Sequence, residues 1–216
     1  KKALELDPGN ANATGNYAVF MYKIRKEYDE AEGLYKKALE LDPGNANNTG
    51  NYALFMHEIR KEYDEAEGLY KKALELDPGN ANTTGNYSEL LLTQGRFDEC
   101  LEYFRRAWKL NGSGNNQLTG VFLFFWCLVN RFIGSNDSPG LSRLKWLLNT
   151  DFERPDWNFD QVLAFTKTRI SPDEFAFYAD VAKAILAPDK TEALNKYEAW
   201  KKLKPVDIKE PWELSV

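Results

Sequence analysis

The chain has 216 residues, a formal net charge of −5, a single histidine and two cysteines. The acidic balance removes the usual electrostatic reason to expect a nucleic-acid partner. One histidine and two cysteines that lie 27 residues apart indicate neither a zinc cluster, nor a redox motif, nor a disulfide framework. The most apolar run, Val121 to Val129, is shorter than the roughly 20 residues that a membrane-spanning helix needs. We therefore expect no cofactor and no membrane partner, and two thiols in a chain of this size favour a reducing, cytoplasmic compartment.

The sequence repeats itself from its first residue. The segment KKALELDPGNAN begins at Lys1, Lys36 and Lys71, which sets a period of 35 residues. The first two copies, residues 1–35 and 36–70, differ at four positions: Ala13/Asn48, Val19/Leu54, Tyr22/His57 and Lys23/Glu58. Such near-identity indicates either recent duplication or deliberate idealisation. The pattern predicts units at 11–45, 46–80 and 81–112, preceded at Lys1 to Pro8 by the end of a truncated helix, and it favours a fragment of a larger protein.

Each unit is predicted to form two helices. The first, Ala11 to Ile24, is apolar on one face and mostly polar on the other. The apolar face holds Tyr17, Phe20, Met21 and Ile24, and the opposite face holds Asn12, Val19, Tyr22 and Lys23, with Asn16 at its edge. The second helix, Tyr28 to Leu41, ends at a Pro-Gly turn because proline cannot continue a helix. Neither helix can bury its apolar face alone, so the units are predicted to stack.

The second helices carry a recurring set of small and aromatic residues, Ala31-Tyr35-Ala38-Pro43 and again Ala66-Tyr70-Ala73-Pro78. With this spacing the chain resembles the tetratricopeptide repeat family over residues 1–112. The resemblance implies an all-α, right-handed solenoid of stacked antiparallel helix pairs, whose first helices line a concave groove. The first two units depart from the family because they have 35 rather than 34 residues, with the additional residue near Arg25 and Arg60.

Residues 113–216 are less regular. Helices are predicted at Leu118 to Ile133 and Pro139 to Leu148, and together they could form a degenerate fourth unit. An irregular connection follows at Thr150 to Asn158, and then a helix at Phe159 to Arg169. Ser171 and Glu174 have the spacing of a capping box at a helix start. From there the chain resembles a further repeat over 172–205, with Ala193, Tyr197 and Pro205 at the family's spacing. This irregular helical part, with the tail Val206 to Val216, is expected to act as a cap.

Two features make the first helices candidates for a binding surface. Three of the four differences between the first two units fall on their polar face, as expected if a fixed scaffold presents a tuned surface, or if an exposed face simply drifts. Asparagine recurs on the same face at two registers, and a ladder of amides could pair with the backbone of an extended peptide. The alternative is that these asparagines cap helices or bond to neighbouring units. The helical glycines Gly15, Gly50 and Gly85 cost roughly 1 kcal/mol each, which indicates a close approach by a neighbouring helix or by a ligand.

The sequence therefore favours a non-enzymatic module that binds a peptide or protein partner in the groove. The candidate contact residues are Asn12, Asn16, Val19, Tyr22, Lys23, Asn47, Asn51, Leu54, His57, Glu58, Asn82, Asn86 and Glu89. Two alternatives stay open. The repeats could be an architectural spacer or idealised scaffold whose functional part is the aromatic-rich region 113–216, or the chain could self-associate through the helical face exposed at Lys1 to Pro8.

Overall fold

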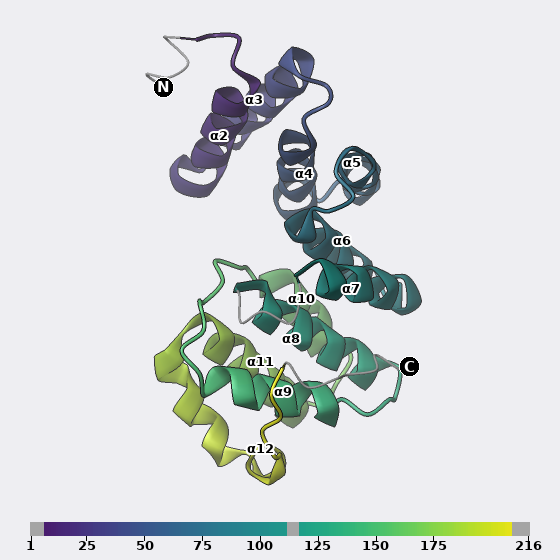
Figure 1. Ribbon diagram of the computed structural model, residues 1–216, viewed down its shortest axis with the longest axis vertical. Helices are drawn as coiled ribbons and strands as arrows, with labels where there is room; N and C mark the ends of the chain where they lie inside the picture. The colour runs from purple at the N-terminus through teal and green to yellow at the C-terminus, as the bar shows by residue number, and fades with distance from the viewer. Residues whose placement is uncertain (1–6, 112–116, 209–216) are drawn as a thin grey trace. The chain divides into compact units, whose positions relative to one another are not determined.

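The computed structural model describes residues 7–111 and 117–208, and all the regular secondary structure in these ranges is helical (Figure 1). The predicted all-α fold is confirmed. The contacts between residues divide the chain into two compact parts: unit 1, Lys1–Leu90, and unit 2, Leu91–Val216. This division comes before residue 112, where the resemblance to the repeats ends in the sequence. The predicted truncated helix at 1–6 and the tail from residue 209 lie outside the described residues.

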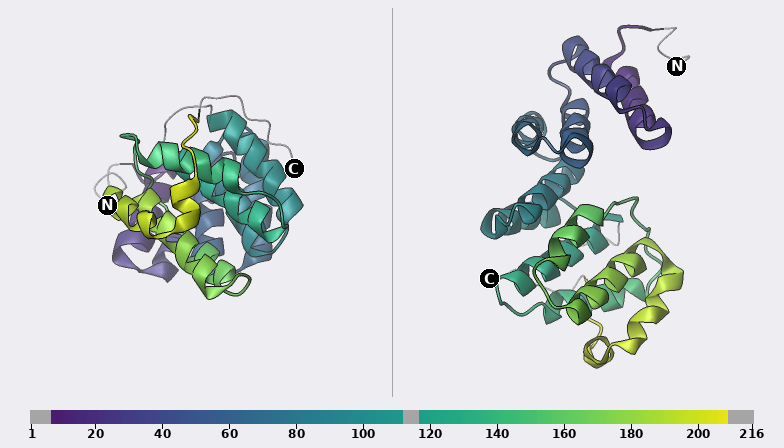
Figure 2. Two further views of the ribbon diagram at one scale, coloured as in Figure 1. Left: turned by 90° about the horizontal axis from the view of Figure 1, so that it is seen from below. Right: turned by 180° about the vertical axis from the view of Figure 1, so that it is seen from behind.

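Unit 1 consists of paired helices. Its helical segments are α2 (Ala11–Phe20), η1 (Met21–Arg25), α3 (Tyr28–Leu41), α4 (Ala46–Phe55), η2 (Met56–Arg60), α5 (Tyr63–Leu76) and most of α6 (Ala81–Thr93). In two opposite views α2 lies beside α3 (Figures 1 and 2), and α4 packs on α5 in the same way. These pairs confirm the two predicted helices of each of the first two units.

Two π-helical segments account for the unusual repeat length. Met21–Arg25 and Met56–Arg60 end the first helices of the first two units with π-type turns. A π-helical turn takes up one residue more than an α-helical turn, so the additional residue near Arg25 and Arg60 is accommodated there. The helix α6, which belongs to a unit without that residue, has no π-helical segment.

The turns after these segments contain non-glycine residues in a left-handed conformation. Lys26 and Lys61 have φ angles of 60° and 61°, whereas Gly95, with a φ of 74°, makes the corresponding turn after α6. A side chain in this conformation costs about 1–2 kcal/mol, which glycine avoids. The turns of the first two units therefore store a small amount of backbone strain.

Replacing Lys26 by glycine should stabilise the chain. We expect Lys26→Gly to raise the free energy of unfolding by about 1 kcal/mol in urea denaturation, because glycine adopts positive φ without a steric cost. The control is Lys26→Ala, which removes the same exposed side chain but keeps the Cβ. Equal stability of the glycine and alanine variants would contradict this explanation.

Aromatic rings connect successive pairs in unit 1. The ring of Tyr35 on α3 lies 5.5 Å from that of Tyr52 and 5.6 Å from that of Phe55, both on α4. Tyr70 on α5 repeats the first of these contacts with Tyr87 on α6, at 5.6 Å. The second helix of each pair therefore buries its tyrosine against the first helix of the next pair.

The first helices of successive pairs approach each other closely. A Cβ atom added to Gly15 on α2 would clash with the side-chain oxygen of Asn48 on α4, and one added to Gly50 would lie 2.6 Å from the Thr83 hydroxyl oxygen. Of the two explanations for these helical glycines, the structure shows the neighbouring helix at both positions.

Unit 2 is built around a buried helix. Its segments after α6 are α7 (Phe97–Asn111), α8 (Gln117–Phe132), α9 (Ser138–Leu148), α10 (Asp160–Lys167), α11 (Pro172–Leu186), η3 (Pro188–Lys196) and α12 (Glu198–Lys202). Every residue of α8 from 119 to 130 is buried, and α7, α9 and α11 pack on this helix. The predicted helices and the irregular connection between α9 and α10 are confirmed, and the apolar run at 121–129 forms the core of unit 2.

The end of unit 2 confirms the predicted helix start but not a regular second helix. The Ser171 hydroxyl oxygen accepts a hydrogen bond from the Glu174 amide, and Glu174 accepts one from the Ser171 amide at 3.1 Å, which completes the capping box. After α11 the chain is 3-10 helical over η3 and then forms the five-residue helix α12. Trp200, which replaces a small residue of the family pattern, is buried 6.3 Å from the Phe177 ring. The family spacing at 193–205 therefore does not produce the long second helix of a repeat.

Candidate partner-binding surface

The sequence-predicted contact residues separate into two groups. Ten are exposed or half-exposed, and they are Asn12, Asn16, Val19, Lys23, Asn47, Asn51, Leu54, Glu58, Asn82 and Asn86. Tyr22, His57 and Glu89 are buried, with exposed fractions of 6%, 0% and 3%. Expecting these three side chains on a solvent-facing groove surface was therefore wrong.

The asparagines at 16, 51 and 86 occupy one position on three successive first helices. Asn16 is exposed and Asn51 and Asn86 are half-buried. Within the ranges that the structure describes, none of the three side chains makes a hydrogen bond. An amide group both donates and accepts, so all three positions retain their full hydrogen-bonding capacity.

Two of the asparagines four residues earlier, Asn12 and Asn47, are used within the stack. The Asn45 side-chain nitrogen donates to the Asn12 side-chain oxygen at 2.9 Å, and the Asn80 side-chain nitrogen donates to the Asn47 side-chain oxygen at 3.0 Å. Asn45 also caps α4, because its side-chain oxygen accepts from the Asn48 amide at 3.0 Å. At this register the asparagine side chains bond to the residue that precedes the next first helix, and Asn45 there caps a helix, as the alternative interpretation expects of some asparagines.

Tyr22 and Glu58, which lie at two of the positions where the first two units differ, contact each other. The Tyr22 hydroxyl donates to a Glu58 carboxylate oxygen at 2.6 Å, and the Tyr22 ring lies edge-on to Phe55 at 5.8 Å. The buried Asn48, at a further differing position, donates to the Ala11 backbone oxygen of α2 at 3.0 Å. Three of the four differences between the first units therefore alter packing between them.

His57 is a core residue of unit 1. Its ring lies edge-on to Tyr63 and Tyr70, at 6.1 and 6.3 Å, and among the described residues neither ring nitrogen has a hydrogen-bond partner. Burial, with a smaller contribution from the Lys61 charge, lowers the pKa of His57 to about 4. The side chain lies in the π-helical segment η2, where the 3.6-residue period used to assign it to the outer face does not apply.

Two carboxylates near the ends of the first helices, those of Glu58 and Glu89, act electrostatically on the same two groups. Partial burial lowers the pKa of Lys61, and the negative charges of Glu58 and Glu89 oppose this shift. The same two carboxylates add to the effect of burial in raising the pKa of Tyr70. Glu58 on η2 and Glu89 on α6 therefore create a local negative potential, whereas Lys23 carries a positive charge at the position equivalent to Glu58.

Sequence reasoning missed Asn45, Asn48 and Asn80. Asn10, Asn45 and Asn80 each precede a first helix, and a cap residue at that place is the signal that could have identified them. In the sequence, Asn48 is distinguished only by its difference from Ala13.

The described residues hold no group of three or more His, Cys, Asp or Glu side chains placed to bind a metal ion. Within the same ranges, no helix combines the length and apolar character needed to cross a membrane.

Models of a known protein family match two segments of the chain. Two family models, both described as tetratricopeptide repeat, match residues 1–46 and 59–113. Among curated proteins nothing matches the chain.

Several solved structures share the fold. PilW, described as a widely conserved type IV pilus biogenesis factor, is 18% identical with a TM-score of 0.57, covering 92% of this chain and 79% of its own. YrrB, described as a TPR protein with an unusual peptide-binding site, is 20% identical with a TM-score of 0.51, covering 96% and 91%. PilF of Pseudomonas aeruginosa is 16% identical with a TM-score of 0.56, covering 87% and 89%. At these identities the likeness is one of fold.

Proposed function

Because residues 1–46 and 59–113 of this chain are tetratricopeptide repeats, which form protein-interaction modules, we propose that the chain binds an extended peptide segment of a partner protein. The peptide lies across α2, α4 and α6 of unit 1. Asn16, Asn51 and Asn86 bond to its backbone, and the surrounding side chains select its sequence.

The observation that carries this proposal is the contrast between two asparagine registers. The Asn12 and Asn47 side chains accept hydrogen bonds from Asn45 and Asn80, which precede the next first helices, whereas the side chains at 16, 51 and 86 make no hydrogen bond within the described ranges. An extended peptide presents amide and carbonyl groups that an asparagine side chain can satisfy together. Backbone recognition of this kind tolerates many sequences, so selectivity comes from other residues.

Charge and apolar contacts supply that selectivity. Lys23 is positive, whereas the half-exposed Glu58 at the equivalent position of the next unit is negative, so the charge of the surface changes sign along the stack. We propose that the bound segment carries an acidic residue near Lys23 and a basic residue near Glu58, because complementary charges fix orientation and steer association. The half-exposed Val19 and Leu54 provide apolar contact between the amides. A solved relative described as having an unusual peptide-binding site supports a peptide as the ligand class.

A peptide selection tests this proposal. Random 12-residue linear peptides displayed on phage are selected on the full chain, and the affinity of a synthetic copy of the enriched peptide is measured by calorimetry. The combined variant Asn16→Ala, Asn51→Ala, Asn86→Ala should bind it about 100-fold more weakly, since each lost hydrogen bond contributes about 1 kcal/mol. Its thermal unfolding should stay close to that of the unmodified chain.

The matched control is Asn12→Ala combined with Asn47→Ala. These residues accept hydrogen bonds from Asn45 and Asn80, so their loss should lower stability and leave peptide affinity nearly unchanged. If no peptide is enriched, or if the triple variant binds the enriched peptide as tightly as the unmodified chain, the proposed function is wrong. Collapse of stability in the triple variant would show instead that these asparagines are structural.

A further inference from the structure

A tyrosine of the first repeat holds a carboxylate of the second. The Tyr22 hydroxyl in η1 donates to the Oε2 atom of Glu58 in η2 at 2.6 Å. Tyr22 is only 6% exposed and its ring lies edge-on to Phe55, so packing fixes the position from which the hydroxyl donates. A carboxylate that is already held in place loses less conformational freedom when it binds a ligand.

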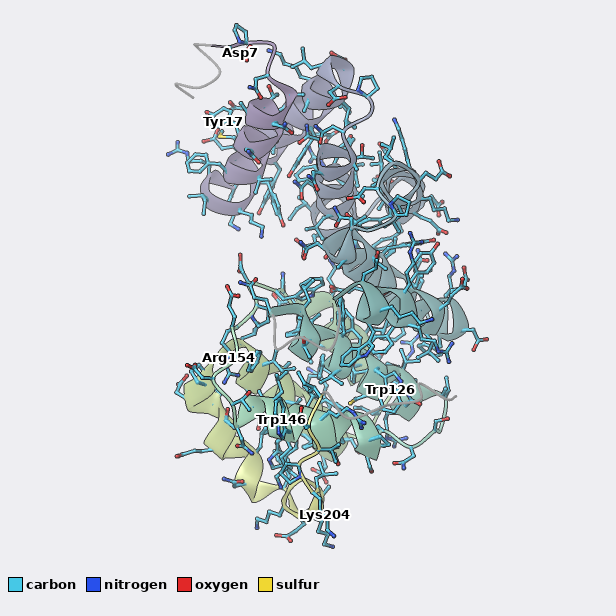
Figure 3. The ribbon with its side chains drawn as sticks, viewed as in Figure 1. Asp7, Tyr17, Trp126, Trp146, Arg154 and Lys204 are labelled. Carbon is cyan, nitrogen blue, oxygen red and sulfur yellow. The ribbon has the colours of Figure 1, made fainter. Side chains whose placement is uncertain are left out.

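The Glu58 carboxylate is held but not neutralised. Side chains with red oxygen and blue nitrogen atoms surround α4 and α5 in Figure 3. Glu58 is half-exposed among them, and within the described ranges it takes part in no ion pair. Its charge opposes the lowering of the pKa of Lys61 by burial, as does the charge of the buried Glu89, but no ion pair joins Glu58 to Lys61. A cation supplied by a ligand would therefore meet an unpaired carboxylate.

A second carboxylate held by a tyrosine shows what such a group binds. The Tyr87 hydroxyl on α6 donates to the Oε1 atom of Glu67 on α5 at 2.9 Å, and the Lys71 ammonium pairs with the same oxygen at 2.7 Å. Lys71 lies four residues after Glu67, whereas the residue four positions after Glu58 is Glu62. At Glu58 the described residues thus supply the hydroxyl but no ammonium.

The held carboxylate occurs at only one of the three first helices. Lys23 and Thr93 are the equivalents of Glu58 in the other two units, so neither presents a carboxylate at this position. Glu58 follows Asn51 by seven residues, which is about 10 Å along a helix and about three residues of an extended chain. A peptide that bonds to Asn51 can therefore place one basic side chain at Glu58.

We propose that Glu58 binds a lysine side chain of the peptide and that Tyr22 is the positioning residue for this contact. The lysine ammonium pairs with Glu58 as Lys71 pairs with Glu67, while the Tyr22 hydroxyl keeps the carboxylate in place. This inference rests on the proposed function. It adds the chemistry of the basic residue in the ligand and a buried residue of the preceding repeat that makes the contact selective.

The probe is the enriched 12-residue peptide, synthesised with an acetylated amino terminus so that its terminal amine cannot compete. We expect this peptide to contain a lysine, and replacing that lysine by norleucine removes the ammonium but keeps the aliphatic chain. The change should weaken binding to the unmodified chain about tenfold, because a charge-assisted hydrogen bond is lost. Glu58→Gln should abolish the difference between the two peptides, and Tyr22→Phe should reduce it to about threefold without affecting the norleucine peptide.

The matched control is Tyr87→Phe. It removes the hydroxyl that donates to Glu67, a carboxylate that already carries Lys71, so the tenfold preference for lysine should remain. Tyr22→Phe keeps the ring that packs on Phe55, and circular dichroism verifies that each variant folds. A purely structural role of Tyr22 would weaken binding of both peptides equally, and that result would overturn the proposal.

The remaining outcomes separate this inference from the proposed function. A peptide that depends on Asn16, Asn51 and Asn86 but contains no lysine, or binds equally with norleucine, contradicts the inference and leaves the proposed function intact. An unchanged preference for lysine in Tyr22→Phe shows that Tyr22 does not position Glu58. If no peptide is enriched, both the proposed function and this inference are wrong.

Discussion

Lowering the pH from 7 to 4 should reduce the free energy of unfolding by about 3 kcal/mol through His57 alone. Its folded-state pKa is about 4, because the ring is buried, and an unfolded histidine titrates near 6.5. The folded pKa is the lower one, so the unfolded state binds more protons between these values and stability falls as the pH falls. A difference of 2.5 pKa units corresponds to about 3 kcal/mol, at about 1.4 kcal/mol per unit.

The measurement is urea denaturation at intervals from pH 7 to pH 4 for the unmodified chain and for His57→Tyr. Tyrosine is the residue of the preceding unit at this position, Tyr22, and it does not titrate in this range. The carboxylates that also titrate in acid contribute to both proteins, so the difference between the two slopes isolates His57. Parallel curves would show that the ring is solvated or paired in the folded chain.

Replacing Gly15 by alanine should lower the stability of the unmodified chain but raise the stability of a chain that carries Asn48→Ala. In the unmodified chain the new Cβ clashes with Asn48, whose side chain donates to the Ala11 backbone oxygen. Displacing Asn48 leaves buried polar groups without partners, which costs about 1–3 kcal/mol and outweighs the roughly 1 kcal/mol that alanine gains as a helix former. We therefore expect Gly15→Ala to destabilise the chain by up to about 2 kcal/mol.

In an Asn48→Ala background the clash disappears, and the same substitution should stabilise the chain by about 1 kcal/mol. The control is Gly33→Ala on α3, where a Cβ meets no atom within 4 Å, so it should stabilise both backgrounds equally. A double-mutant cycle in urea measures the coupling. Additive effects of the Gly15 and Asn48 substitutions would contradict the close approach of α2 and α4.

The regular parts of the fold follow from local sequence. The second helix was predicted at Tyr28 to Leu41, and α3 has these bounds, because its first turn is acidic and a Pro-Gly turn follows its end. The additional residue near Arg25 was located because the repeat is longer than the family pattern. The sequence does not predict the form that this residue takes, which is a π-helical segment followed by Lys26 in a left-handed conformation.

The positions that the sequence misassigned depend on neighbours in space. His57 was placed on the outer face by counting 3.6 residues per turn, and the rings of Tyr63 and Tyr70 enclose it instead. The spacing at 193–205 matched the family, yet the segment is mainly 3-10 helical, and the bulky Trp200 replaces a small residue there. Periodicity identifies which residues are able to share a face, whereas packing decides which of them solvent reaches.

The recurring asparagines show what the sequence predicts about the site and what depends on contacts in space. The recurrence of Asn12 and Asn16 every 35 residues was visible in the sequence. Which of the two registers bonds within the stack depends on the position of Asn45, which lies 33 residues from Asn12 in the sequence and donates to its side chain. The candidate site thus narrows from two registers to the one at 16, 51 and 86.

The side-chain amide resonances of the asparagines test the central claim most directly. The full chain, labelled with ¹⁵N, is titrated with the enriched 12-residue peptide and followed by NMR, with assignments from single Asn→Asp variants. We predict large shifts for the amide groups of Asn16, Asn51 and Asn86 and small shifts for those of Asn45 and Asn80, which donate within the stack. Peptide-induced shifts confined to other residues, with the amides of Asn16, Asn51 and Asn86 unchanged at saturation, would contradict the account.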